Sequence, residues 1–138
     1  MSNMKYYKII ILSVLVYILI GFSTYFSMHQ YSNDISSSCF NCSYKRDIFL
    51  SSAYISLIFI LLVLLKKIWG KNWNISIFFS FVFVILVFFN NYNIFSDRVS
   101  AWSSYTLSDE LISVLSSSYI YLIISTVLVF ILLKLYKF

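Results

Sequence analysis

The stretch NWNISIFFSFVFVILVFFNNYNIFS, residues 72–96, contains no charged side chain and decides the class of fold. A transmembrane helix needs about 20 predominantly apolar residues to cross the hydrocarbon core of a bilayer. Three further uncharged stretches, residues 9–28, 48–65 and 111–133, have comparable length. The sequence therefore predicts four membrane-spanning helices.

The composition also indicates that lipid is the main solvent of this chain. Of its 138 residues, 61% are hydrophobic and only 11% are charged, whereas a soluble domain carries about 25% charged residues. Continuous apolar runs lack the alternation of a transmembrane barrel strand. We expect an all-α polytopic four-helix bundle that forms a single domain over residues 1–138. The predicted spans are 9–28, 48–65, 74–92 and 113–133, with outer loops at 29–46 and 93–112.

The basic residues predict the orientation, because cytoplasmic loops of membrane proteins carry an excess of Lys and Arg. Seven of the ten basic residues fall on one side of the predicted spans: Lys5, Lys8, Lys66, Lys67, Lys71, Lys134 and Lys137. All five acidic residues fall on the other side. We expect a multi-pass protein of the bacterial inner (plasma) membrane with both termini in the cytoplasm. The net charge of +5 follows from this topology, so the lipid bilayer is an expected partner and nucleic acid is not.

The second outer loop contains a segment with two readings. Leu107, Leu111 and Ile112 recur at near-helical spacing among serines and acidic residues. The segment either lies on the outer membrane surface as an amphipathic helix or is a solvated loop that leads into the last span. The serine runs at 36–38 and 116–118 suggest no mechanism from sequence.

Both cysteines belong to one motif, CFNC, with Cys39 and Cys42 on the outer side just before the second helix. Outside the cytoplasm thiols meet oxidants, so we expect this pair to be able to form a disulfide. A helix N-terminus with Lys45 and Arg46 nearby favours the thiolate, which is the reactive species. A CxxC is equally compatible with a small structural disulfide or two incidental cysteines. No metal is expected, because His29 cannot complete a tetrahedral zinc site with one cysteine pair.

The run CFNCSYKR, from Cys39 to Arg46, resembles the C-x-x-C-x-Y-x-R signature of the DsbB/BdbC disulfide-bond formation proteins. Gly21 with YFS at 25–27 is similar to the end of the first helix in that family. Family members have four transmembrane helices, cytoplasmic termini and a CxxC at the outer end of the second helix. The resemblance covers roughly residues 21–50 of the 138, and the remainder matches in topology.

The resemblance implies a membrane thiol:quinone oxidoreductase that takes electrons from a periplasmic thioredoxin-fold protein and passes them to quinone as cofactor. Cys39 and Cys42 would be the catalytic pair, with Cys39 exchanging with the partner thiol and Cys42 facing the quinone. Arg46 would contact the quinone, because a guanidinium stays charged and donates hydrogen bonds to an oxygen that gains electrons. Lys45 and Arg46 are also compatible with an ordinary interfacial anchor pair.

The chain departs from the family pattern in two respects. Family members usually keep a second cysteine pair in the second outer loop, and residues 90–118 contain none. Ser38 and Asn41 stand where the family commonly has Pro and Leu. Electrons would therefore have to pass directly from the partner to Cys39.

A second hypothesis comes from another class of function. Small four-helix inner-membrane proteins rich in Phe, Tyr, Ile and Ser resemble immunity or exclusion proteins in size and layout. Such a protein is not an enzyme; it would protect its host from a pore-forming toxin, which would be its partner. A transporter is less favoured, because no ionisable residue falls inside a predicted span.

Overall fold

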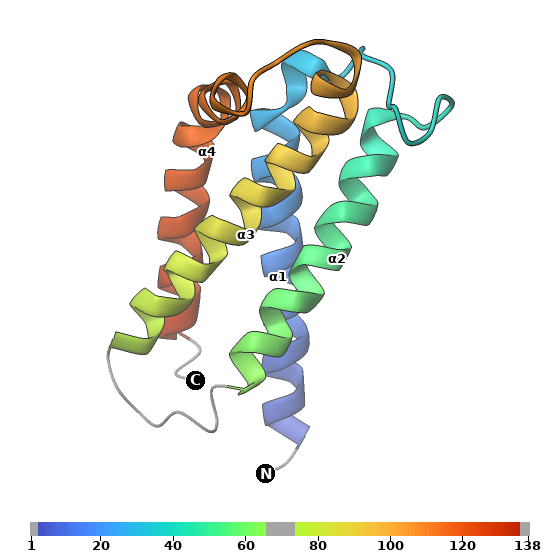
Figure 1. Cartoon of the computed structure of the whole chain (residues 1–138). Helices are drawn as coiled ribbons and strands as arrows, with labels where there is room; N and C mark the ends of the chain where they lie inside the picture. The colour runs from blue at the N-terminus through green and yellow to red at the C-terminus, as the bar shows by residue number, and fades with distance from the viewer. Residues whose placement is uncertain (1–2, 66–73, 136–138) are drawn as a thin grey trace.

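The computed structural model describes residues 3–65 and 74–135 (Figure 1). Within these residues the chain is helical and contains no strand. The long helices are α1 (Asn3–Ser27), α2 (Tyr44–Leu65), α3 (Asn74–Arg98) and α4 (Leu107–Leu135), with short 3-10 turns η1 (His29–Tyr31) and η3 (Ser100–Trp102). Each long helix contains a stretch long and apolar enough to cross a membrane. The prediction of four such helices is confirmed.

The helices form an up-down-up-down bundle (Figure 1). Each helix packs against the next, α4 closes the ring against α1, and α1 also touches α3 across the bundle. The start of α1 and the end of α4 lie at the same end of the bundle (Figure 1). The segments 28–43 and 99–106 meet at the opposite end, which we call the loop end.

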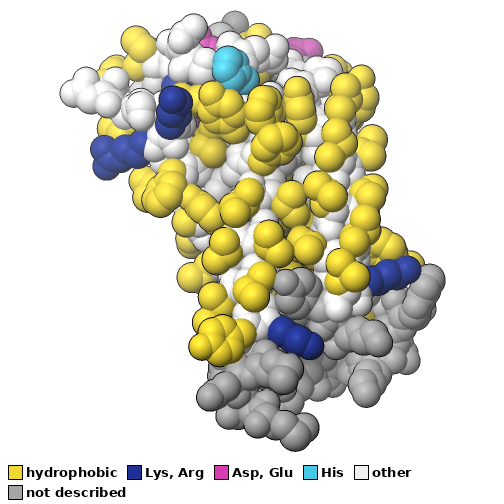
Figure 2. Space-filling view, turned by 180° about the vertical axis from the view of Figure 1, so that it is seen from behind, with side chains coloured by type: hydrophobic (Ala, Val, Ile, Leu, Met, Phe, Trp, Pro, Cys, Tyr) yellow, Lys and Arg dark blue, Asp and Glu magenta, His cyan; other side chains and the backbone are white. Residues whose placement is uncertain are grey.

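Large apolar side chains fill the centre of the bundle. The Phe59 ring lies edge-on to the Phe83 ring at 5.5 Å and to the Phe79 ring at 6.4 Å between centroids, and Val16 and Val87 are fully buried beside them. The outer surface is apolar too, and Figure 2 shows hydrophobic side chains covering the helices between rims that carry the basic residues. A helix that is hydrophobic all round is typical of a membrane span, so the structure supports contact with a lipid bilayer.

A polar layer lies inside the bundle toward the loop end. Asn90 donates to the Thr24 hydroxyl at 2.9 Å, which joins α3 to α1, and the Ser125 and Ser23 hydroxyls lie 3.5 Å apart between α4 and α1. Asn91 is fully buried, and neither end of its amide has a partner within the described residues. Small polar side chains commonly bridge helices in membranes, and this layer does so.

Three helices extend beyond the predicted spans into the predicted loops. Helix α2 begins at Tyr44, α3 continues to Arg98, and α4 begins at Leu107. The predicted span ended at residue 92, but α3 continues through Asp97 to Arg98, and Arg98 is buried. The connection at the loop end between α3 and α4 is consequently shorter than the sequence suggested.

Helix α4 bends near its start. Figure 1 shows its first turns, in orange, almost end-on, while the rest of the helix runs along the bundle. Three successive hydroxyls, of Ser116, Ser117 and Ser118, donate to carbonyls three or four residues back. Such back-bonding bends helices, which gives the serine run a structural role. The segment from Leu107 is helical, and Ile112 on it is 65% exposed; that this part of α4 lies on the outer membrane surface stays a prediction.

The charges divide between the two ends of the bundle. Lys8 near the start of α1 and Lys134 near the end of α4 lie at the end with the termini, and all acidic residues lie at or beside the loop end. Lys66, Lys67, Lys71 and Lys137 lie outside the described residues.

Candidate disulfide site at the loop end

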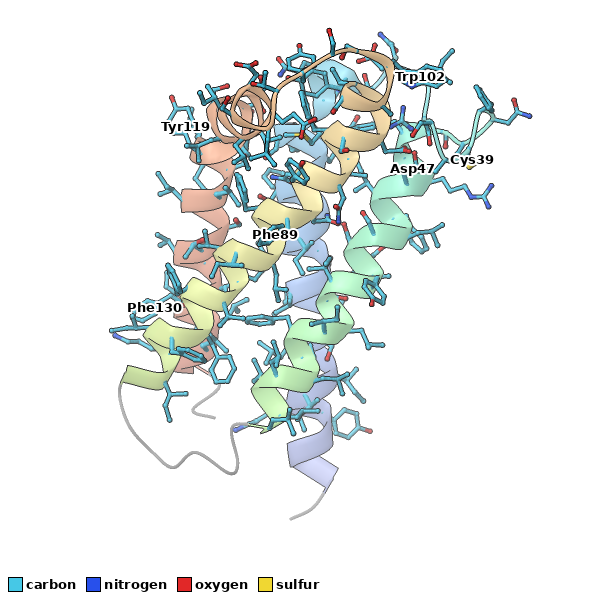
Figure 3. The ribbon with its side chains drawn as sticks, in the orientation of Figure 1. Cys39, Asp47, Phe89, Trp102, Tyr119 and Phe130 are labelled. Carbon is cyan, nitrogen blue, oxygen red and sulfur yellow. A yellow bond between two sulfur atoms is a disulfide. The ribbon has the colours of Figure 1, made fainter. Side chains whose placement is uncertain are left out.

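The cysteine pair lies in the turn that leads into α2. Cys39 and Cys42 are joined by a disulfide, with their Cα atoms 5.3 Å apart, and the Cys42 amide donates to the Cys39 carbonyl at 3.0 Å. Both cysteines are half-buried, whereas Phe40 between them is 71% exposed. Figure 3 shows Cys39 at the edge of the loop end, where Asp47 and Trp102 also lie. The disulfide that the sequence made possible is present in this turn.

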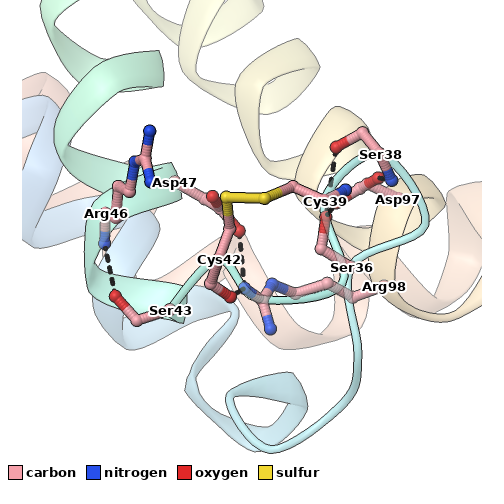
Figure 4. Close-up of a disulfide and its surroundings, with 9 residues drawn as sticks. All are labelled: Ser36, Ser38, Cys39, Cys42, Ser43, Arg46, Asp47, Asp97 and Arg98. Carbon is pink, nitrogen blue, oxygen red and sulfur yellow. Dashed lines mark hydrogen bonds and ion pairs between the residues drawn. A yellow bond between two sulfur atoms is a disulfide. The ribbon is translucent and has the colours of Figure 1, made fainter.

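The Cys39 side of the turn is held by the end of α3. The Asp97 carboxylate accepts from the Ser37 hydroxyl at 2.8 Å and from the Ser38 amide at 2.9 Å, and its backbone carbonyl accepts from the Ser37 amide at 3.0 Å. The Cys39 amide in turn donates to the Ser36 hydroxyl at 3.1 Å. The serine run at 36–38 therefore fastens the loop to α3 (Figure 4).

The Cys42 side is held by Arg98, which is 3% exposed. Its guanidinium forms an ion pair with Asp47 at 2.5 Å and donates to the carbonyls of Asp34 at 2.5 Å and Cys42 at 3.4 Å. It also lies over the Tyr44 ring, 5.3 Å from the centroid. Removing one partner of a buried ion pair costs about 3–5 kcal/mol, because the other charge is left uncompensated.

Tyr44 connects this cluster to α1. Its hydroxyl donates to the Tyr25 carbonyl at 2.7 Å, and the two rings pack with centroids 5.6 Å apart. Met28 and Phe95 complete the apolar cluster beneath the loop. The Tyr31 ring packs edge-on against Phe95, and burial raises the pKa of its hydroxyl above the ordinary value.

The segment between α3 and α4 contacts the cysteine loop through Trp102. Trp102 donates from its indole nitrogen to the Ile35 carbonyl at 2.8 Å, and its ring lies edge-on to Phe40 with centroids 5.9 Å apart. At the start of α4, Glu110 accepts hydrogen bonds from Tyr92 and Ser100. The two loop-end segments are therefore bound to each other.

Two hollows adjoin at this site. A polar cleft of about 450 Å³ is lined by residues that include Cys42 and Arg98, and an apolar groove of about 380 Å³ runs along α1 and α2. Tyr25 and Lys45 line both. Gly21 forms part of the groove, and a Cβ placed there would stand 3.7 Å from the Ser52 hydroxyl. An elongated amphiphile could thus place a polar head near Cys42 and an apolar tail between the helices.

The structure brings together Cys39 and Cys42, two of the predicted site residues. Arg46 is exposed, and its guanidinium has no hydrogen bond or ion pair within the described residues. In the view of Figure 4, Cys42 lies between Arg46 and Arg98. The role of Arg46 toward a quinone stays a prediction, and the buried arginine at this site is Arg98.

Sequence reasoning missed Arg98, Asp97 and Trp102 as members of the site. All three fall in the outer loop predicted at 93–112, to which the sequence assigned no role in the cysteine site. Their partners lie 51 to 67 positions away in the chain, and no local spacing reports such contacts. Within residues 3–65 and 74–135, no three His, Cys, Asp or Glu side chains gather as metal ligands.

Comparisons with protein-family models, with curated proteins and with solved structures return no match for this chain. The resemblance to the DsbB/BdbC proteins, over roughly residues 21–50, stays a prediction from the sequence.

We predict that Asp97→Ala loosens the Cys39 side of the turn without disturbing the bundle. The loss of two hydrogen bonds to a partly exposed carboxylate should lower local protection by about 1 kcal/mol, which is roughly a fivefold change. Chymotryptic cleavage after Phe40, followed by mass spectrometry, should accelerate by that factor. Asp109→Ala is the matched control, because Asp109 bonds within its own turn to Thr106. Equal cleavage rates for the Asp97 variant and the wild type would contradict the assigned role.

Proposed function

We propose that the protein is a membrane thiol–disulfide oxidoreductase whose Cys39–Cys42 pair exchanges electrons with an extracytoplasmic thiol partner. The observation that carries this proposal is that the cysteine turn is bound on both sides by contacts that do not involve sulfur. Asp97 holds the chain before Cys39, and Arg98 holds the chain at Cys42. The disulfide can therefore open without releasing the loop.

A structural role gains less from this disulfide than from one that closes a long loop. Cross-linking a 15-residue loop stabilises a protein by about 3 kcal/mol in the chain-entropy model. Cys39 and Cys42 are three positions apart, and the same model gives about 2 kcal/mol for so short a loop. The buried Arg98–Asp47 pair holds the same turn more strongly. This comparison favours a chemical role for the sulfurs.

We propose that the exchange proceeds in two thiol–disulfide steps. A partner thiolate attacks the Cys39 sulfur, the disulfide bond breaks, and Cys42 leaves as a thiolate. The partner's second thiolate then resolves the mixed disulfide, so that two electrons move to Cys39 and Cys42 while the partner becomes oxidised. The Cys39 and Cys42 thiolates take up the two protons that the partner's thiols released on ionising. Cys39 is half-buried and adjoins the exposed Phe40, whereas Cys42 lines the cleft. These positions support an exchange of Cys39 with the partner and a role of Cys42 toward the cleft.

The residues at the loop end suit a quinone as the electron acceptor. The apolar groove along α1 and α2 would hold the tail, and Tyr25, Lys45 and Arg98 border the cleft in which a polar head would lie. A bound quinone would accept the two electrons and two protons released when the disulfide re-forms. Arg46, at the start of α2, is proposed to assist from the exposed side.

We infer from the charge distribution that the loop end faces away from the cytoplasm of a bacterial cell and that both termini are inside. Lys8 and Lys134 mark the inner end of the bundle, and the acidic residues gather at the other end. Positively charged segments stay on the cytoplasmic side. The plasma membrane is then the location in which the Cys39–Cys42 pair meets oxidants.

We predict that reporter fusions placed after Lys71 and after Phe138 are active in the cytoplasm, and that a fusion after Trp102 is active outside it. The physical reason is the excess of lysine at the inner end. Alkaline phosphatase and a fluorescent protein give complementary readouts. An external reading after Phe138 would contradict the orientation.

We predict that the purified protein has no free thiol until mild reductant is added. Cys42→Ser should then trap a mixed disulfide between Cys39 and a thioredoxin-fold protein of the same compartment, detected as a reductant-sensitive adduct. Cys39→Ser is the matched control and should trap much less, because Cys42 faces the cleft. Free thiols in untreated cells would contradict the proposal.

The second candidate is a toxin-immunity protein, in which the cysteines have no catalytic role. Two features favour it: the chain holds one cysteine pair, and Phe40 and Trp102 expose aromatic surface at the loop end, where a toxin would arrive. Full biological activity in the double Cys39→Ser, Cys42→Ser variant would support this candidate over the oxidoreductase.

A further inference from the structure

We propose that the Arg98–Asp47 pair is a positioning and charge-balancing device for Cys42, which holds that residue in place and sets how readily the Cys39–Cys42 disulfide is reduced. This inference rests on the proposed function, since it assigns a regulator to the same cysteine pair. It concerns a residue on α3 that the CxxC signature does not include.

Arg98 connects the end of α3 to the cysteine loop and to α2. Its side chain leaves the last turn of α3, yet the acceptors it contacts belong to the cysteine loop and to the first turn of α2: Asp34, Cys42 and Asp47. A planar guanidinium can bind several acceptors in a fixed geometry, and a lysine ammonium cannot reproduce that fork. Arg98 thereby fixes the backbone of Cys42 relative to two helices.

The two cysteines differ in how the chain beside them is held. The Cys39 side is held by hydrogen bonds from serines to Asp97, and these bonds are exposed. The Cys42 side is held by a guanidinium that is 3% exposed. When the disulfide opens, the Cys39 side is therefore the freer one, and Cys42 keeps its place at the cleft.

The charges of Arg98 and Asp47 act on the reduced form of Cys42. Reduction produces a thiolate on Cys42, the residue whose carbonyl Arg98 contacts at 3.4 Å. The guanidinium favours this negative charge, and Asp47, paired with the guanidinium at 2.5 Å, offsets most of that effect. The two side chains should therefore act in opposite directions on the thiol–disulfide equilibrium. An ion pair that only stabilised the fold would not shift the thiol–disulfide equilibrium in opposite directions when one or the other of its members is removed.

The test is a double-variant cycle on the full-length protein in detergent, equilibrated with reduced and oxidised glutathione at about pH 8, where thiolates are populated. Arg98→Gln should shift the equilibrium constant toward the disulfide, and Asp47→Asn should shift it toward the dithiol. Each shift should be about tenfold, which corresponds to about 30 mV. The double variant, which removes both charges, should return to within about threefold of the wild type, because the opposing effects cancel.

Asp109→Asn is the matched control, since it removes an exposed charge at the loop end whose hydrogen bonds stay within its own turn, and it should change the constant less than about threefold. Shifts of the same sign in both single variants, or no shift, would overturn the inference. If Arg98→Gln fails to fold, as judged by circular dichroism, Asp47→Asn and the double variant still decide: the first must shift toward the dithiol and the second must return. A wild-type pair that never exchanges with glutathione would instead refute the proposed function itself.

Discussion

The loop end of this protein depends on the buried ion pair between Arg98 and Asp47. Arg98 comes from the last turn of α3 and Asp47 from the first turn of α2, and the guanidinium also binds the carbonyls of Asp34 and Cys42. Without its carboxylate partner the Arg98 guanidinium, which is 3% exposed, would be left as an uncompensated charge. The ion pair therefore determines where the cysteine turn lies over the bundle.

The bundle below is stabilised in a different way. Lipid solvates the outside of the helices as well as apolar side chains solvate the inside, so the hydrophobic effect contributes little to helix association. Packing of large rings such as Phe59 and Phe83, together with the Thr24–Asn90 hydrogen bond, brings the helices together. Polar contacts thus specify the arrangement, and they become denser toward the loop end.

The sequence was sufficient to predict the four helices and insufficient to predict their ends. Uncharged runs report the hydrocarbon core, since charge is costly there. The same criterion failed at Arg98, because its charge is buried and its partners in space come from other segments of the chain. A sequence pattern carries the helical period but not the partner of a side chain 51 positions away.

The candidate site was predicted in the same uneven way. The CxxC and its place before α2 follow from the sequence, because the two cysteines are adjacent to a long apolar run. The contacts of the serine run with Asp97 and of Trp102 with Ile35 could not be foreseen. These contacts change the interpretation of the disulfide, because they hold the turn without it.

The most direct test of this account is hydrogen exchange of the loop end in the oxidised and in the reduced protein. If Asp97, Arg98 and Trp102 hold the turn, amides from Asp34 to Ser38 and from Tyr44 to Asp47 should keep their protection after reduction. Faster exchange should then be confined to residues 39–42. Loss of protection along the whole segment 34–47 would show that the disulfide is a structural staple, and it would contradict the central claim that the pair opens without releasing the loop.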